Sequence, residues 1–423
     1  MAHEPREGVP ARGPHADPSG RRVSAAEREV LAPSSEEEAA AVVATCAGAG
    51  RRLSIRGGGT RTGLGRPATA DAILSAARLS GIVFHAPSEM VICAGAGTPL
   101  ADIEAALATH GQQLAFEPMD HRVLLASTGA PTIGAVASAN VSGPRRINGG
   151  AARDSLIGIR LVNGRGEIVK SGGRVMKNVT GLDLVKLVSG AYGTLGFLTE
   201  VTFKVLPKAE QAATLVIHGL DDVTAIAALS AALGSPFEPT GAAHLPAGMD
   251  WSGARTLIRV EGFSDSVTYR LDAIGRLVAA GHRTERIDGT DSEALWRNVR
   301  DAAYLADPHS DAVWRISTAP TRGPEVTAAI SRQLPGARWF YDWGGGLVWL
   351  STLAAGDAGA GVIRAAMATT GGHATLVRAP DAVRAAVPVF QPLDSVSMRL
   401  TEGIKASFDP EGVFEPGRMY LAV

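Results

Sequence analysis

Residues 53–65 read LSIRGGGTRTGLG, a short apolar strand that runs directly into a glycine-rich loop. The loop holds Gly57, Gly58 and Gly59, and Thr60 adds a hydroxyl group. Because glycine has no Cβ atom, several main-chain N–H groups of such a loop can approach one diphosphate. This stretch therefore predicts a site for a nucleotide-sized ligand.

Two more glycine-rich turns follow within about 140 residues. Residues 132–137 (TIGAVA) lead into an expected short helix, whose N-terminus would favour an anion. Gly190, Gly193 and Gly196 would let the main chain pass close to a flat ring system. Each turn alone is equally well explained by ordinary turn chemistry. The three together, in strand–loop–helix contexts, indicate a dinucleotide-sized ligand.

Two common nucleotide motifs are excluded or disfavoured. A Walker loop needs a lysine directly after a glycine, and no such pair occurs in the chain. Residues 63–68 (GLGRPA) match the Rossmann fingerprint formally. However, Pro67 lies inside the expected first helical turn and no strand runs directly into the motif, so we do not expect a Rossmann site.

Composition bounds the function further. The 41 basic and 42 acidic residues leave a formal charge of −1, so the overall charge gives no indication of nucleic-acid binding. No stretch reaches the ~18 apolar residues of a membrane span. Residues 1–27 have no apolar signal core, so we expect a disordered leader in a cytoplasmic protein that could reach the inner membrane only through partners. Two cysteines, Cys46 and Cys93, are too few for an iron–sulfur cluster, which needs about four thiolates.

The local signals predict a mixture of helices and strands. Ser34 and Ser35, each with a glutamate three residues later, predict a capped helix over 36–46. Thr98 before Pro99 predicts another helix N-cap. Asn163-Gly164 predicts a hairpin. Beyond residue 208 the predicted elements include strands over 312–317 and 347–352, and five of the six tryptophans lie between residues 296 and 349.

Five segments, taken in order, resemble the FAD-binding domain of the vanillyl-alcohol-oxidase type, also called PCMH-type. They are RGGGTRTGLG, AGAGTPLADIEAAL, TIGAVASANVSGPRR, the stretch from ARDSLIG to FKVLP, and DPEGVFEPGRMY. The strings GPRR, GGRVMKNVTG and PGRMY are most similar to the family of FAD-binding E subunits of glycolate oxidase. The resemblance is dense over residues 30–208, loose in the middle, and good over the last 25 residues.

The resemblance implies an α+β fold. A PCMH-type domain of two α/β subdomains would occupy residues 28–208, an α+β cap on the substrate side residues 209–397, and a C-terminal segment, 398–423, would pack back on the FAD domain. The implied FAD-binding residues are Arg56, Gly57, Gly58, Gly59, Thr60 and Gly63 at the pyrophosphate, Thr132, Gly134, Asn140, Ser142 and Gly143 along the ribityl and diphosphate path, and Gly193, Gly196, Phe197 and Thr199 on the adenosine side. Covalent attachment in this superfamily uses a histidine in the first glycine loop. Thr60 stands there in this chain, so we expect non-covalent FAD.

Oxidation of a 2-hydroxy acid on a flavin requires a cation for the carboxylate and a base for the hydroxyl proton. Arg315, in the strand Trp314-Arg315-Ile316-Ser317, is a candidate carboxylate clamp, with a structural ion pair as the alternative. His373 is a candidate for proton chemistry, with a turn or core histidine as the alternative. Related catalytic flavin subunits carry a His-x-His metal site that this chain lacks, so no metal site is expected.

Two functions of different classes remain open. In the first, the chain is the FAD-binding subunit of a glycolate oxidase or dehydrogenase complex. It then oxidises a small 2-hydroxy acid (glycolate to glyoxylate), or relays its electrons, with a catalytic flavin subunit and an iron–sulfur subunit as partners. In the second, it is a non-catalytic FAD-fold scaffold that organises those subunits. A UDP-sugar reductase on the same scaffold fits the C-terminal sequence less well. Trp339, Tyr341, Trp343 and Trp349 are the candidate partner face.

Overall fold

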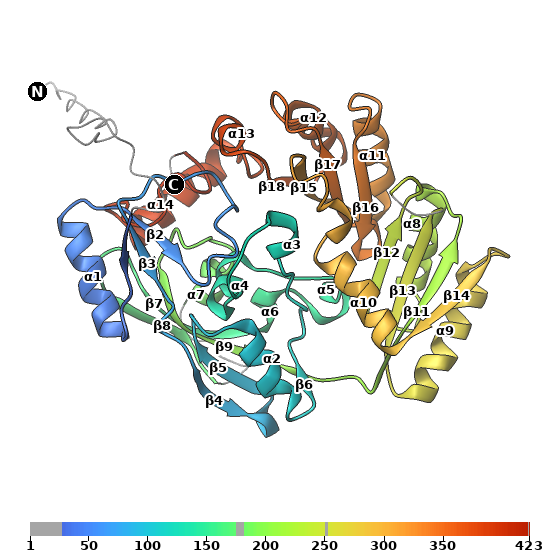
Figure 1. Cartoon of the computed structure of the whole chain (residues 1–423), viewed down its shortest axis with the longest axis horizontal. Helices are drawn as coiled ribbons and strands as arrows, with labels where there is room; N and C mark the ends of the chain where they lie inside the picture. Colours follow the sequence, from blue (N-terminus) through green and yellow to red (C-terminus); the bar gives the residue numbers. More distant parts are fainter. Residues whose placement is uncertain (1–27, 175–181, 250–252, 422) are drawn as a thin grey trace, which may run out of the picture.

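The computed structural model describes residues 28–174, 182–249, 253–421 and 423, which form two lobes (Figure 1). The predicted leader and part of the GGRVMKNVTG string lie outside the described residues. The described residues include a three-stranded, a five-stranded and an eight-stranded sheet, and a two-stranded ribbon of β6 (Gln112–Gln113) and β10 (Leu206–Pro207). In the described part of the chain no helix is both long and apolar enough to cross a bilayer.

The three-stranded sheet begins the first lobe. Its strands are parallel, in the order β1-β3-β2, and consist of β1 (Glu29–Leu31), β3 (Ala72–Ser75) and β2 (Leu53–Arg56). Helix α1 (Glu36–Gly48) packs on it through a small apolar core. Ser35 accepts a hydrogen bond from the main-chain N–H of Glu38, which confirms the predicted cap. Strand β2 ends where the glycine loop begins.

The five-stranded sheet completes the first lobe. Its antiparallel strands are β4 (Ile82–Ala86), β5 (Val91–Gly95), β9 (Phe197–Lys204), β7 (Leu156–Val162) and β8 (Ile168–Gly172), in that order. The β7–β8 pair confirms the predicted hairpin. Short helices connect the strands: α2 (Leu100–Ala108), α3 (Arg122–Leu125), α4 (Ile133–Ala139), α5 (Arg146–Gly149), α6 (Ala152–Ser155) and α7 (Leu184–Val188).

The predicted N-cap at Thr98 is wrong. Helix α2 begins one residue later than expected, with Pro99 in the cap position and no side-chain hydrogen bond there. The Thr98 hydroxyl donates instead to the carbonyl of Gly95 at 2.6 Å and accepts from the N–H of Gly81. Thr98 therefore closes the turn after β5 rather than starting the helix.

The second lobe is built on the eight-stranded antiparallel sheet, in the order β14-β11-β13-β12-β16-β17-β15-β18 (Figure 1). Its strands are β11 (Gln211–His218), β12 (Gly241–Leu245), β13 (Arg255–Gly262), β14 (Thr284–Asp288), β15 (Ala312–Ser317), β16 (Arg338–Asp342), β17 (Leu347–Thr352) and β18 (His373–Arg378). The bounds of β15 and β17 coincide with the predicted strands.

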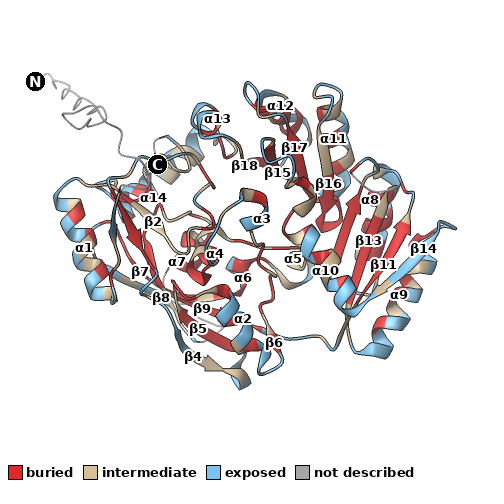
Figure 2. Ribbon diagram, viewed as in Figure 1, coloured by how far each residue is buried: buried red, intermediate tan, exposed pale blue. Residues whose placement is uncertain are grey.

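The two faces of this sheet have different neighbours. One face is covered by α8 (Asp222–Leu233), α9 (Ser264–Val278), α11 (Gly323–Ser331) and α12 (Ala360–Thr370). The other face carries α10 (Gly289–Arg300) and shares a core with the five-stranded sheet of the first lobe. Both faces are therefore largely buried, as Figure 2 shows. Tyr341, Trp343 and Trp349 lie in these cores, so the prediction of an exposed aromatic partner face is wrong for them.

The C-terminal segment returns to the first lobe after α13 (Asp381–Ala386) and α14 (Ser395–Phe408). The N–H of Leu53 in β2 donates to the carbonyl of Val413 at 2.7 Å, and Glu415 accepts from the N–H of Ile55 at 2.8 Å. Buried Lys405 donates to the carbonyl of Thr194 and is paired with Asp409. The end of the chain thus supports the strand that leads into the glycine loop, and the predicted α+β fold is confirmed.

Candidate functional site

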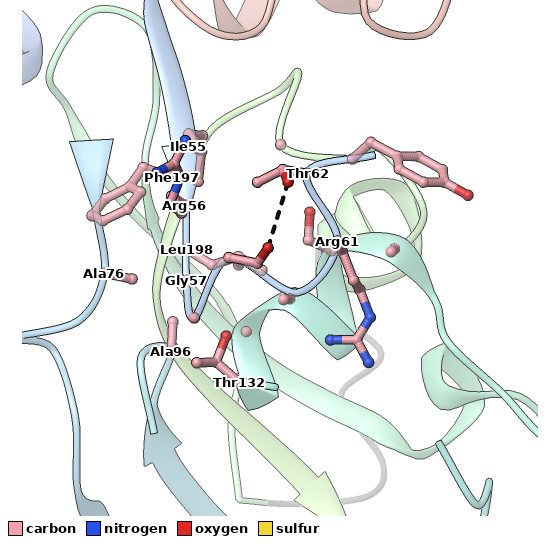
Figure 3. A pocket seen from close by; sticks show the side chains of 18 of the residues that line it. Ile55, Arg56, Gly57, Arg61, Thr62, Ala76, Ala96, Thr132, Phe197 and Leu198 are labelled. Carbon is pink, nitrogen blue, oxygen red and sulfur yellow. Dashed lines mark hydrogen bonds between the residues drawn. The ribbon is translucent and has the colours of Figure 1, made fainter. Parts of the chain in front are cut away.

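The first glycine loop presents a row of free donors. Within the described part of the chain, the main-chain N–H groups of residues 57–60 donate no hydrogen bond. These residues line a channel together with Arg56, at the end of β2 (Figure 3). Clustered main-chain N–H groups without acceptors are suited to phosphate oxygens. The loop therefore has the donor set that a diphosphate needs.

The glycines of this loop are required by a close approach to the chain ahead of α4. A Cβ atom at Gly57 would lie 2.2 Å from the hydroxyl oxygen of Thr132. A Cβ atom at Gly58 would lie 1.7 Å from the carbonyl oxygen of Ala130. The contact at Gly57 could be relieved by rotation of the Thr132 side chain, whereas the contact at Gly58 is with main chain and requires one of the two loops to move. The two loops are therefore held at a spacing that only glycine permits.

The second loop contributes a side chain rather than the expected main-chain donors. The N–H groups of Ile133 and Gly134 donate to the carbonyls of Thr98 and Ala96, at 3.0 and 2.9 Å. The prediction of a second donor-rich turn is therefore wrong for these two amides. The hydroxyl of Thr132, however, is buried and has no hydrogen-bond partner. A buried hydroxyl without a partner costs about 1–3 kcal/mol, so a ligand oxygen beside it would be stabilising.

Most of the residues predicted to bind FAD line this channel, and some lie elsewhere. Those in the channel are Arg56, Gly57, Gly58, Gly59, Thr60, Thr132, Gly134, Gly193, Gly196 and Phe197. Asn140 and Ser142 line a second cavity. Gly63 and Arg384 line a third cavity, which Arg56, Gly57, Gly58 and Gly59 border as well as the channel.

The structure does not bring Gly143 or Thr199 to these cavities. The carbonyl of Gly143 accepts from the indole N–H of Trp343 at 3.1 Å. The hydroxyl of Thr199 donates to Glu36 at 2.6 Å, toward helix α1. Tyr192 and Arg418 are among the channel residues that sequence reasoning missed. Arg418 belongs to the PGRMY string, which carried the family resemblance but no assigned role.

A second cavity of about 430 Å³, which we call the chamber, lies between the first lobe and the eight-stranded sheet. It shares the lining residues Leu64, Ala139 and Tyr192 with the channel, so the two cavities are adjacent. A nucleotide held by the glycine loop would therefore have one end directed toward the chamber. The free amides, the unpartnered Thr132 hydroxyl and the glycine spacing all fit the diphosphate of FAD.

The chamber wall on the sheet side follows from strand alternation. In β15 Trp314 and Ile316 pack against the helices, so Arg315 points to the opposite face. In the antiparallel β18 Thr375 pairs with Arg315, and His373 is two residues away. Such diagonal positions have Cβ atoms about 7–8 Å apart. Arg315 and His373 both line the chamber, so the structure brings the two predicted catalytic residues together.

The chamber is cationic. Its lining includes Arg146, Arg153 and Arg315, together with His121 and His373, and no acidic side chain among the described residues. Burial lowers the pKa of Arg315 to about 10, which leaves it charged at neutral pH. Burial and the nearby guanidinium groups of Arg315 and Arg146 lower the pKa of His373. His373 is therefore mostly neutral at pH 7 and able to accept a proton.

His121, which sequence reasoning did not select, has a fixed protonation state. The Nε–H of buried Arg61 donates to Nδ1 of His121 at 3.2 Å. Because an arginine nitrogen can only donate, Nδ1 must accept and the ring proton must lie on Nε2. Burial and the charge of Arg61 lower the pKa of His121 to about 3. His121 is thus a neutral N–H donor and cannot act as a base near neutral pH.

Metal ligands are not grouped in this structure. No three histidine, cysteine, aspartate or glutamate side chains come together at metal-binding distance in the described ranges. Both cysteines are buried, and burial raises the pKa of the Cys93 thiol to about 12. The thiols therefore offer neither a cluster ligand set nor a reactive thiolate.

Comparisons with known proteins agree with this geometry. Residues 28–172 match a family described as FAD binding domain. The chain is 34% identical to glycolate oxidase subunit GlcE of Escherichia coli K12 over 87% of this chain and 92% of that protein. It is 29% identical to a D-lactate dehydrogenase of Archaeoglobus fulgidus over 44% of this chain and 41% of the relative.

Among solved structures, 4-ethylphenol oxidase from Gulosibacter chungangensis superimposes with a TM-score of 0.70. The superposition covers 93% of this chain and 89% of that one at 15% sequence identity, so it establishes the shared fold alone. The match to GlcE extends over 369 residues, which is nearly the whole of both chains. The chain therefore belongs to the glycolate oxidase subunit GlcE family of FAD-linked oxidoreductases.

Proposed function

We propose that this chain is an FAD-binding subunit of a glycolate oxidase complex that binds FAD non-covalently and oxidises a 2-hydroxy acid in the chamber. In this proposal residues 28–208 hold the cofactor and residues 209–397 form the substrate-side cap. The observation that carries it is that the channel adjoins a chamber lined by Arg315 and His373. A scaffold without turnover would not need a cationic chamber at the end of its cofactor channel.

The residues of the channel and the chamber each have a defined role in this proposal. The free amides of residues 57–60 and the Thr132 hydroxyl bind the diphosphate of FAD. FAD, when bound, supplies the two-electron acceptor. Arg315 holds the substrate carboxylate, and a guanidinium can do so with two parallel hydrogen bonds. His373, neutral at pH 7, takes the hydroxyl proton.

The non-covalent attachment follows from Thr60, whose side chain cannot form the bond that a histidine forms in the superfamily. The partners we propose are a catalytic flavin subunit and an iron–sulfur subunit of the glycolate oxidase complex. The two cysteines, Cys46 and Cys93, are too few to hold an iron–sulfur cluster. In this proposal the electrons taken from the substrate leave the flavin through the iron–sulfur subunit.

Three measurements on the purified chain test the proposal. Binding of FAD should quench flavin fluorescence on titration, and acid should release the flavin from the protein intact. Anaerobic glycolate should then reduce the flavin, even if slowly without the partner subunits, and R315M should abolish that reduction without changing FAD affinity. An FAD-loaded chain that neither glycolate nor D-lactate reduces, alone or in the complex, would refute the catalytic role and favour the scaffold.

A further inference from the structure

Trp343 belongs to the predicted aromatic partner face, but the structure buries it and the proposed function does not use it. It follows strand β16 directly, and 8% of its surface is exposed. It is not among the described residues that line the channel or the chamber. Its indole ring nevertheless contacts a chamber residue, since the guanidinium carbon of Arg315 lies 4.9 Å from the ring centroid. Trp343 therefore lies behind the chamber wall, next to the residue proposed to hold the substrate carboxylate.

The guanidinium of Arg315 is held without the use of its hydrogen-bond donors. Among the described residues it forms no ion pair and donates no hydrogen bond. Its nitrogen atoms are not among the enclosed atoms that lack a partner, and Arg315 lines the chamber, so its N–H groups are open to that cavity. An ion pair would fix the side chain but would occupy the donors that a substrate carboxylate needs. Attraction to an aromatic face fixes the cation and leaves these donors free.

Trp343 also connects the eight-stranded sheet to the first lobe. Its indole N–H donates to the carbonyl of Gly143 at 3.1 Å, and the guanidinium carbon of Arg146 lies 4.5 Å from its ring centroid. Gly143 and Arg146 belong to the first lobe, which carries the cofactor channel, whereas Arg315 lies in strand β15 of the sheet. One indole ring therefore fixes the position of Arg315 relative to the lobe that would hold FAD.

The main chain at Trp343 has a conformation that is rare for a bulky residue. Its φ angle is +52°, in the left-handed region that favours glycine. A carboxyl oxygen of Asp342 accepts a hydrogen bond from the N–H of Trp343 at 2.7 Å and supports this conformation. The turn is also closely packed, since a Cβ atom at Gly345 would lie 2.6 Å from the carbonyl oxygen of Pro320. Strained residues that the surrounding structure fixes in this way cluster at functional sites, which favours a positioning role over simple core packing.

We propose that Trp343 is a positioning residue for substrate binding: its indole ring holds the guanidinium of Arg315 in the chamber wall with the N–H groups free for the carboxylate of a small 2-hydroxy acid. The inference rests on the proposed function for the role of Arg315. It adds a residue that lies outside both cavities and acts on the substrate only through Arg315.

The test measures the binding of acetate, which is glycolate without its hydroxyl group and therefore cannot be oxidised there. Acetate binding to the FAD-loaded chain can be followed by the change in flavin absorbance on titration. W343L should weaken acetate binding by about five- to thirtyfold, the factor that corresponds to a partly desolvated cation–π contact. W343F keeps an aromatic face and should lose less affinity. FAD affinity, measured by quenching of flavin fluorescence, should be unchanged in both variants because Trp343 does not line the channel.

A double-mutant cycle separates positioning from a general loosening of the fold. R315M should weaken acetate binding more than W343L does, and W343L should cause no further loss when Arg315 is already replaced. If W343L fails to fold, W343F serves in the same cycle. W339L is the matched control, because the indole N–H of Trp339 donates to Asp222 and its ring packs on the helix-covered face of the sheet. W339L should leave acetate affinity unchanged, even if it lowers the thermal transition.

The outcomes distinguish this inference from the proposed function. Unchanged acetate binding in W343L, or an equal loss with and without Arg315, would overturn the positioning role of Trp343 and leave the proposed function intact. Unchanged acetate binding in R315M would refute the role of Arg315 as the carboxylate-binding residue, and the positioning role of Trp343 with it.

Discussion

Replacement of Gly58 by alanine is the sharpest perturbation of the cofactor channel. The added Cβ would lie 1.7 Å from the carbonyl oxygen of Ala130, whereas real Cβ atoms keep at least about 3.0 Å. The glycine loop and the loop ahead of α4 must then separate, and both loops carry groups assigned to the diphosphate. N–H···O bonds weaken steeply beyond about 3.2 Å, so we expect one or two of them to be lost.

Each such bond to a charged group contributes about 1.5–3 kcal/mol, and a factor of ten in affinity corresponds to about 1.4 kcal/mol. G58A should therefore weaken FAD binding by roughly ten- to a hundredfold or more, measured by quenching of flavin fluorescence. Gly63 provides the control, because its Cβ would lie 3.8 Å from Leu125 in ordinary contact. G63A should bind FAD as the unmodified chain does. An unchanged FAD affinity in G58A, with the thermal transition also unchanged, would refute the assigned channel.

Three further results are expected. T132V should weaken FAD binding by a few-fold to tenfold while leaving the cofactor-free chain equally or more stable in thermal denaturation, because a buried hydroxyl without a partner is removed. Burial alone would raise the pKa of Glu117, but the paired Arg259 lowers it to about 2. The Glu117 carboxylate therefore stabilises the fold above pH 4.5, and this contribution to stability is lost as the pH falls toward 2. Acid denaturation followed by circular dichroism should show this loss, and E117Q should lack it. The rate of flavin reduction should rise with pH to a plateau, and its half-maximum should lie below pH 6.5 because the pKa of His373 is lowered. A half-maximum above pH 6.5, or an unchanged pH profile in H373Q, would show that another residue is the base.

The parts of the fold predicted from sequence were those encoded within a few residues. The capping serines, the glycine loop and the Asn163-Gly164 turn act locally, and the structure contains all three. The order of the eight-stranded sheet joins strands up to about 100 residues apart, as in the pairing of His244 with Tyr341, and no local pattern specifies it. Strand β14 at its edge is mostly exposed, so it lacks the apolar alternation that would have revealed it.

In the functional site, too, features encoded by neighbouring residues were predictable and features that depend on distant residues were not. Alternation in the strand around Trp314 was enough to select Arg315, because the apolar neighbours fix which face it occupies. The sequence could not show that the amides of Ile133 and Gly134 are already hydrogen-bonded within the protein, because their acceptors come from the turn after β5. His121 was missed because its role depends on Arg61, a partner 60 residues earlier in the chain.

The central claim is that one channel holds the diphosphate of FAD and opens into the cationic chamber. A crystal structure of the chain with FAD tests it most directly. The account predicts phosphate oxygens within hydrogen-bond distance of the amides of residues 57–60 and of the Thr132 hydroxyl, with the flavin ring reaching the chamber beside Arg315. A diphosphate in the third cavity, next to Gly63 and Arg384, with the Thr132 hydroxyl still unpartnered, would contradict it.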